Sequence, residues 1–125
     1  MDNPYNIVIV EDDLAIREAT TMLLELSGYT VRSFEDLTSF NNDSTPPPDL
    51  YLVDRQLRGE DGLTLCTDVK SNPLLKHIPV IIMSASPETE DMSEKHGCDA
   101  FLPKPFTRLA LEAVVARLLP ELPAV

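Results

Sequence analysis

The chain has 125 residues, of which 43% are hydrophobic and 25% charged, and these proportions fit one globular domain with its own core. It carries 21 acidic and 10 basic residues, which argues against a nucleic-acid-binding surface because phosphate contacts need clustered Lys and Arg. The longest apolar runs, Ile7–Val10 and Val80–Met83, are far shorter than the roughly 18 residues that span a bilayer. The N-terminal region is acidic and lacks a signal-peptide pattern. We therefore expect one cytoplasmic domain over residues 1–125, with its core over about 6–119 and no contact with nucleic acid or membranes.

Five short apolar runs alternate with helical patterns. The runs, which we predict to be strands, are Asn6–Val10, Thr30–Phe34, Leu50–Val53, Val80–Met83 and Ala100–Leu102. Several are apolar at every position, which is typical of strands covered on both faces. Five βα repeats with right-handed crossovers predict an α/β fold, a flavodoxin-like (βα)5 doubly wound parallel sheet with strand order 2-1-3-4-5.

The helices are predicted from apolar spacing and from capping residues. The inner stripe of the first helix is predicted to be Ala15, Ala19, Met22, Leu23 and Leu26. Predicted helix starts are a capping box at Ser33–Asp36, the pair Ser86-Pro87, and Thr107. Within Pro87–His96 only Met92 is large and apolar, so we expect this fourth helix to be weakly anchored and comparatively mobile.

Polar residues follow the predicted strands at the edge where sites form in open parallel sheets. Glu11 and Asp12 follow the first strand, Asp54 the third, Ser84 the fourth and Lys104 the fifth. Two carboxylates about 4 Å apart repel by roughly 4 kcal/mol at an effective dielectric near 20, so one is protonated or a cation lies among them. Mg²⁺ or Mn²⁺ suits such oxygen ligands. With a hydroxyl and an ammonium nearby, the pocket suits phosphoryl transfer to a carboxylate.

This set of residues resembles the receiver domain of two-component response regulators, the chemotaxis-type phosphoacceptor module. The resemblance covers residues 6 to about 119 and rests on four motifs: Val10–Asp13, Val53–Gly62, Ile82–Ala85 and Gly97–Phe106. Each motif alone is a weak signal, whereas all four in this order and spacing are a specific one.

The resemblance implies that Asp54 accepts a phosphoryl group from a histidine kinase or a phosphotransfer protein, in a switch domain rather than an enzyme. The resemblance also implies that the domain then slowly hydrolyses its own phosphoryl group. The implied Mg²⁺ ligands are Glu11, Asp12, Asp54 and the backbone carbonyl of Gln56. Ser84 and Lys104 would contact the phosphoryl group, and Ser84 and Phe101 would form the conformational switch. The Lys104–Pro105 peptide bond would be cis.

Some features depart from the family or stay open. Arg58 replaces the usual Pro, and Phe101 replaces the common Tyr. We expect Arg55, Gln56 and Arg58 to face solvent, although Gln56 and Ser86 stand at positions that tune phosphoryl lifetime in the family. The resemblance also implies an output domain or target protein, which the sequence does not identify, and allows a homodimer formed on phosphorylation.

Three alternatives compete with this interpretation. A receiver-fold binding module that does not cycle phosphate would bind Mg²⁺ weakly. A haloacid-dehalogenase-like phosphatase is disfavoured because Gln56 stands where those enzymes have a second Asp. A flavodoxin is disfavoured because Glu11 and Asp12 would repel a phosphate. Cys66 and Cys98 form no CxxC motif, and we expect them to be reduced and inert thiols.

Overall fold

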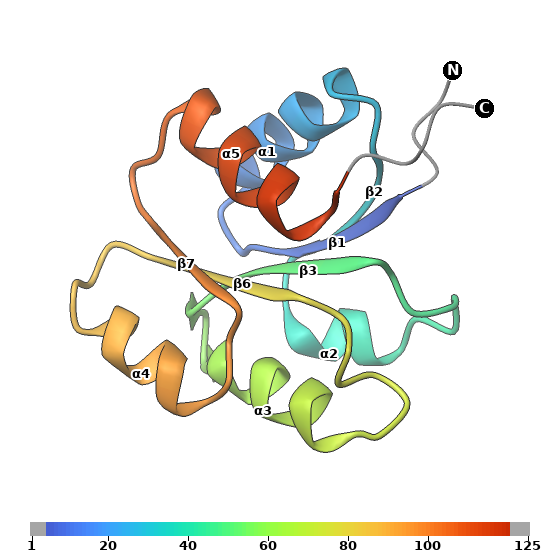
Figure 1. Ribbon diagram of the computed structural model, residues 1–125, viewed down its shortest axis with the longest axis vertical. Coiled ribbons are helices and arrows are strands. Elements are labelled where there is room, and N and C mark those ends of the chain that lie inside the picture. Colours follow the sequence, from blue (N-terminus) through green and yellow to red (C-terminus); the bar gives the residue numbers. More distant parts are fainter. Residues whose placement is uncertain (1–4, 121–125) are drawn as a thin grey trace.

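A five-stranded parallel sheet forms the centre of the computed structural model, which describes residues 5–120 (Figure 1). Its strands are β1 (Asn6–Val10), β2 (Thr30–Phe34), β3 (Leu50–Asp54), β6 (Val80–Ser84) and β7 (Ala100–Pro103). The order is β2-β1-β3-β6-β7, with every neighbouring pair parallel. Because β6 and β7 are the fourth and fifth predicted strands, this order confirms the flavodoxin-like 2-1-3-4-5 prediction.

Two further strands were not predicted. β4 (Gln56–Leu57) and β5 (Glu60–Asp61) pair antiparallel and form a small ribbon directly after β3. With two residues each, they are too short to show the period-2 alternation by which strands are recognised. Gly59, with φ of +73°, lies in their connecting turn.

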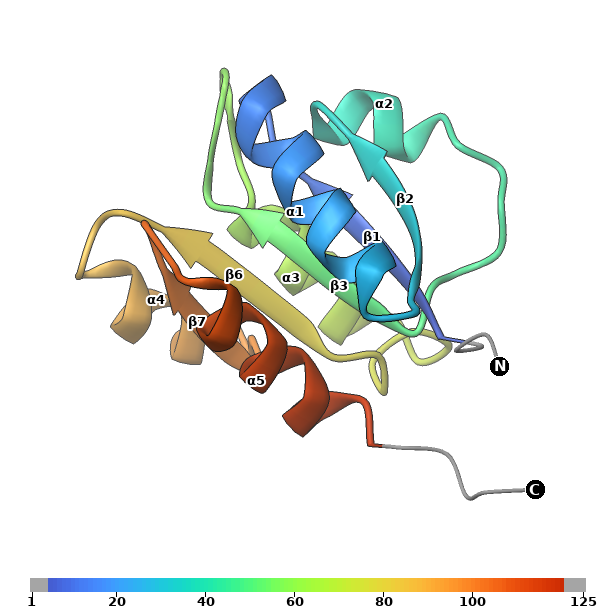
Figure 2. The ribbon, with the colours of Figure 1, turned by 90° about the horizontal axis from the view of Figure 1, so that it is seen from above.

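Helices cover both faces of the sheet. Figures 1 and 2 show α1 (Leu14–Leu26) and α5 (Arg108–Leu118) on one face. The opposite face carries α2 (Leu37–Asn41), α3 (Leu63–Ser71) and α4 (Thr89–Lys95). Among residues 5–120, none of these helices has the length and apolar character needed to cross a bilayer.

The continuous apolar strands divide the core in two. Ile7 and Ile9 point to the α1/α5 face, where they join a buried cluster with Leu111. Val8 and Val10 point the other way, into the cluster under α2, α3 and α4. Side chains alternate across a strand, so a strand covered on both faces must be apolar at every position. The interpretation of these runs as doubly covered strands is confirmed.

The predicted inner stripe of α1 is wrong for most of its members. Met22 is 57% exposed and Leu26 68% exposed, whereas Thr20 and Leu24 are buried. Leu23 alone of the predicted stripe packs against the core. The helix has apolar residues on two adjacent rows, so spacing alone did not distinguish them.

The helix starts were predicted with mixed success. Thr107 caps α5 through a hydrogen bond from the Ala110 N–H (3.1 Å), as predicted. α2 is capped by Asp36, and Ser33 of the predicted capping box instead lies in β2. α4 begins at Thr89 rather than at Pro87, and the Ser86 hydroxyl accepts a hydrogen bond from the Gln56 side chain.

Candidate functional site

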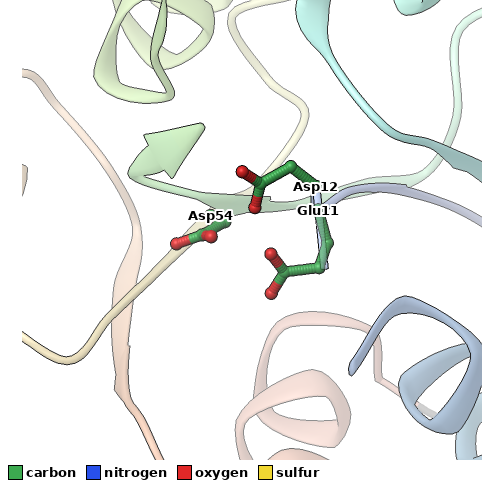
Figure 3. Close-up of side chains that lie close together, drawn as sticks. All are labelled: Glu11, Asp12 and Asp54. Atoms are coloured by element: carbon green, nitrogen blue, oxygen red, sulfur yellow. The ribbon is translucent and has the colours of Figure 1, made fainter. Parts of the chain in front are cut away.

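Three carboxylates meet at the carboxyl edge of the sheet. Glu11 and Asp12 follow β1, Asp54 ends the adjacent β3, and their side chains lie close together (Figure 3). One carboxylate oxygen of each lies within 4.8 Å of those of the other two. Glu11 is 1% exposed and Asp54 is 4% exposed. Buried carboxylates at this spacing repel strongly, so the cluster suits a hard divalent cation with oxygen ligands.

Lys104 brings a positive charge into this cluster from the loop after β7. Its Nζ is ion-paired with Glu11 Oε1 and lies 3.2 Å from Asp54 Oδ2. Its backbone N–H donates to the Ser84 carbonyl (2.9 Å), and the Lys104–Pro105 bond is cis, the geometry expected from the resemblance. One ammonium balances only part of the negative charge of three carboxylates.

The electrostatics of Glu11 and Lys104 follow from this arrangement. Burial raises the pKa of Glu11, and the neighbouring Asp54 raises it further, against the opposing effect of Lys104. Burial lowers the pKa of Lys104, but its hydrogen bond to Glu11 and the charges of Asp54 and Glu11 outweigh burial and raise that pKa. The pocket therefore retains its ammonium and still favours additional positive charge.

The Ser84 hydroxyl, at the end of β6, belongs to a hydrogen-bond network beside the carboxylates. It donates to Gln56 Oε1 (2.9 Å) and accepts from the Ser86 N–H (3.0 Å) and the Thr89 hydroxyl (3.0 Å). The Gln56 backbone N–H lies 3.3 Å from Asp54 Oδ1. Gln56 thus connects Ser84 to Asp54, through its side-chain oxygen and its backbone N–H. The sequence indicated a role for its backbone carbonyl but not this connection.

Thr89 and Arg55 are two members of this network that the sequence did not indicate. Thr89 is completely buried in the first turn of α4, and its hydroxyl accepts a hydrogen bond from Arg55 Nη1 (2.9 Å). The expectation that Arg55 faces solvent is wrong, since 17% of its side chain is exposed. With the buried Ser93 and the half-buried Met92, Thr89 anchors α4, so small polar side chains add to the single large apolar one in its sequence.

Gly62 allows α3 to begin close to Asp54. A Cβ atom at this position would lie 2.1 Å from the Asp54 carbonyl oxygen. The Asp61 carboxylate accepts a hydrogen bond from the Leu63 N–H (2.9 Å), which helps to start the helix. Gly62 therefore sets how closely α3 approaches the end of β3.

Phe101 lies on β7 at the edge of a groove. It is half-buried and packs against the core cluster on the α2–α4 face. With Ser84, Pro87, Glu90 and other residues it lines a space of about 400 Å³.

Several known proteins are similar in sequence to this chain. It is 34% identical over 121 residues to the phosphate regulon transcriptional regulatory protein PhoB of Escherichia coli, covering 91% of this chain and 53% of PhoB. It is 34% identical over 125 residues to the transcriptional regulatory protein CseB of Streptomyces coelicolor, covering 95% of this chain and 51% of CseB. The chain thus spans about half the length of these curated relatives.

A solved structure agrees with the curated relatives. The signal receiver domain of a signal transduction histidine kinase from Syntrophus aciditrophicus superposes with a TM-score of 0.80 at 32% identity, covering 92% of this chain and 89% of that one. The family described as the response regulator receiver domain matches residues 7–116. The chain belongs to the response regulator receiver domain family.

Proposed function

We propose that Asp54 is the phosphoacceptor of this receiver domain and takes its phosphoryl group from a phosphohistidine of a histidine kinase or a phosphotransfer protein. The observation that carries the proposal is the convergence of Lys104 and the carboxylates of Glu11 and Asp12 on the buried Asp54. An Asp54 oxygen attacks the phosphorus, the phosphorus–nitrogen bond breaks, and the imidazole leaves with the electron pair. Water later attacks the same phosphorus, which releases phosphate and restores the Asp54 carboxylate.

Glu11, Asp12, Asp54 and the backbone carbonyl of Gln56 would hold Mg²⁺, with Mn²⁺ as a substitute. When bound, the cation neutralises the phosphoryl oxygens and the repulsion among the acids. Lys104 supplies a second positive charge from the loop after β7 and orients the attacking carboxylate. Each anionic group of the reaction then has a nearby positive charge.

The conformational response would begin at Ser84. Its hydroxyl is shared between Gln56 and Thr89, so turning it toward a phosphoryl oxygen on Asp54 would break the first contact and disturb the second. Thr89 begins α4, and Phe101 borders the same groove as Ser84. We infer that the switch consists of Ser84, Phe101 and α4, biased by the phosphoryl group.

We further infer a single cytoplasmic receiver domain with its core over about residues 6–119, switching rather than catalysing a reaction on other substrates. The expectation of no nucleic-acid contact rests on the composition of this chain and does not extend to the full length of its relatives. Because those relatives are transcriptional regulators, control of transcription is the output to test first.

The proposal is tested by intact mass after incubation with Mg²⁺ and acetyl phosphate. We expect one phosphoryl adduct that is lost with chelator and absent from Asp54→Asn. Asp61→Asn, a change of a more exposed carboxylate seven residues later, is the matched control and should still gain phosphate. Absence of an adduct at saturating donor and Mg²⁺ would overturn the proposal in favour of a binding module that does not cycle phosphate.

A further inference from the structure

Two thiols lie side by side away from the carboxylates. Cys66 is buried on α3, and Cys98 is half-buried in the segment between α4 and β7. The Cys98 thiol donates a hydrogen bond to Cys66 Sγ at 2.7 Å. Two disulfide-bonded sulfurs are about 2.05 Å apart, so bond formation requires the sulfurs to approach by less than about 1 Å.

Contacts that do not involve sulfur hold the two segments together. On α3, Thr67 Oγ1 lies 2.8 Å from His96 Nδ1, and Lys70 forms an ion pair with Asp99 at 2.7 Å. These partners lie on either side of Cys98 in the chain, and the α3 residues lie within about one turn of Cys66. These contacts therefore hold Cys66 and Cys98 next to each other without a bond between the sulfurs.

We propose that Cys66 and Cys98 form a reversible disulfide when the protein meets a hydroperoxide such as hydrogen peroxide. The sulfur of one thiolate attacks a peroxide oxygen, the O–O bond breaks, and a sulfenic acid forms with release of hydroxide. The sulfur of the second cysteine then attacks the sulfenic sulfur, the S–O bond breaks, and water leaves. In total the two thiols lose two electrons and two protons, and hydrogen peroxide is reduced to two waters.

The local chemistry favours this step. The hydrogen bond from Cys98 lowers the pKa of the Cys66 thiol, more than burial raises it. The same hydrogen bond raises the pKa of Cys98, so one proton is retained between the two sulfurs. Thiolate character is what reacts with peroxides, and the half-buried Cys98 gives a small oxidant access to the pair.

The disulfide would restrict α4. The Cys98 N–H donates to the Ser93 carbonyl in α4 (2.9 Å), so a covalent bond from Cys98 to α3 fixes the end of that helix. This link would respond to oxidant and is independent of phosphorylation at Asp54. Disulfides of this kind in reducing compartments are usually transient and sensory.

The full chain tests the proposal. The reduced protein is treated with hydrogen peroxide and then unfolded in the presence of N-ethylmaleimide, which alkylates free thiols. Its intact mass is then measured. We expect neither cysteine to be alkylated, a loss of two hydrogens from the reduced mass, a cross-linked peptide joining Cys66 to Cys98, and recovery of both thiols after dithiothreitol. Two alkylated cysteines after excess oxidant, or a bond only between separate chains, would overturn it.

Cys98→Ser and Cys66→Ser are the paired variants, each with circular dichroism to establish folding. Neither can form the internal bond, so each should keep an alkylatable thiol or become irreversibly oxidised under the same treatment. Cys98→Ser changes the more accessible residue and so keeps the test valid if the buried position does not tolerate serine. A two-hydrogen loss that persists in either variant would contradict the assignment.

Discussion

The Ser84 hydroxyl donates a hydrogen bond to the side-chain oxygen of Gln56 at 2.9 Å, which fixes the orientation of the hydroxyl. A neutral hydrogen bond contributes about 1 kcal/mol, or roughly a fivefold change in a population. Gln56→Ala should free Ser84 for the phosphoryl group and slow phosphoryl loss by about two- to fivefold. The measurement is the decay of the intact-mass adduct after donor removal. Arg58→Ala, an exposed residue of the same loop, should leave the decay unchanged.

Glu11 is expected to destabilise the metal-free fold at neutral pH. Because its folded pKa is raised, stability from this group is present below the ordinary glutamate pKa and is lost as pH rises through the folded value. Glu11→Gln should therefore raise the melting temperature at pH 7.5 by about 2 to 5 °C without metal. The gain should shrink toward pH 4.5, and stabilisation by Mg²⁺ should weaken. Thermal melts with Glu18→Gln, an exposed acid on α1, provide the control.

Lys104 should oppose Mg²⁺ while stabilising the metal-free protein. Lys104→Met leaves Glu11 and Asp54 buried without their cation, which should cost about 2 to 4 kcal/mol in unfolding free energy. The same change removes a competing positive charge, so calorimetric titration should show tighter Mg²⁺ binding. Lys95→Met, on the exposed side of α4, should alter neither quantity. Weaker Mg²⁺ binding by Lys104→Met would show that the ammonium does not compete with the metal.

Thr89 should account for much of the anchoring of α4. Thr89→Val keeps the shape but removes the hydroxyl that joins Arg55 to Ser84, at an expected cost of about 1 to 3 kcal/mol. Amide hydrogen exchange should accelerate in α4 more than in α5. Thr64→Val, an exposed threonine on α3, is the comparison. Uniform acceleration across the domain would indicate a general loss of stability rather than a local anchor.

Gly59 and Gly62 should respond differently to alanine. Gly59 has φ of +73° and open space around it, so Gly59→Ala should cost about 1 to 2 kcal/mol from backbone strain alone. Gly62→Ala places a Cβ against the Asp54 carbonyl oxygen, so it should cost more and also reduce phosphorylation. Denaturant melts and the acetyl phosphate assay separate the two effects. Equal losses at both positions would contradict the close approach of α3 to β3.

The sheet order and the acidic pocket were predictable because they depend on short-range patterns and one topological rule. Continuous runs such as Ile7–Val10 can be buried only between two helical layers, and the 2-1-3 order brings Glu11 next to Asp54. The inner face of α1 was not predictable, because the buried Leu24 and the exposed Met22 are both apolar residues on adjacent rows of the helix. The packing of the whole domain decides between them.

The polar network around Ser84 could not be predicted for a related reason. Thr89 and Arg55 are 34 residues apart and are joined by a single hydrogen bond, which leaves no periodic signal. Threonine occurs both on protein surfaces and in cores, so the sequence does not indicate that Thr89 is completely buried. Its burial depends on where α4 packs. That helix has only one large apolar residue, Met92, which therefore suggested weak anchoring, although small buried hydroxyls add to its contact with the core.

Glu60, in β5, connects the ribbon after Asp54 to a distant helix. Its carboxylate accepts hydrogen bonds from the Leu37 N–H (2.8 Å) and the Thr38 hydroxyl (3.2 Å), at the first turn of α2. With only five residues, α2 is far below the length at which an isolated helix persists in water. α2 therefore depends on contacts from the rest of the domain, and the ribbon after Asp54 supplies two of them.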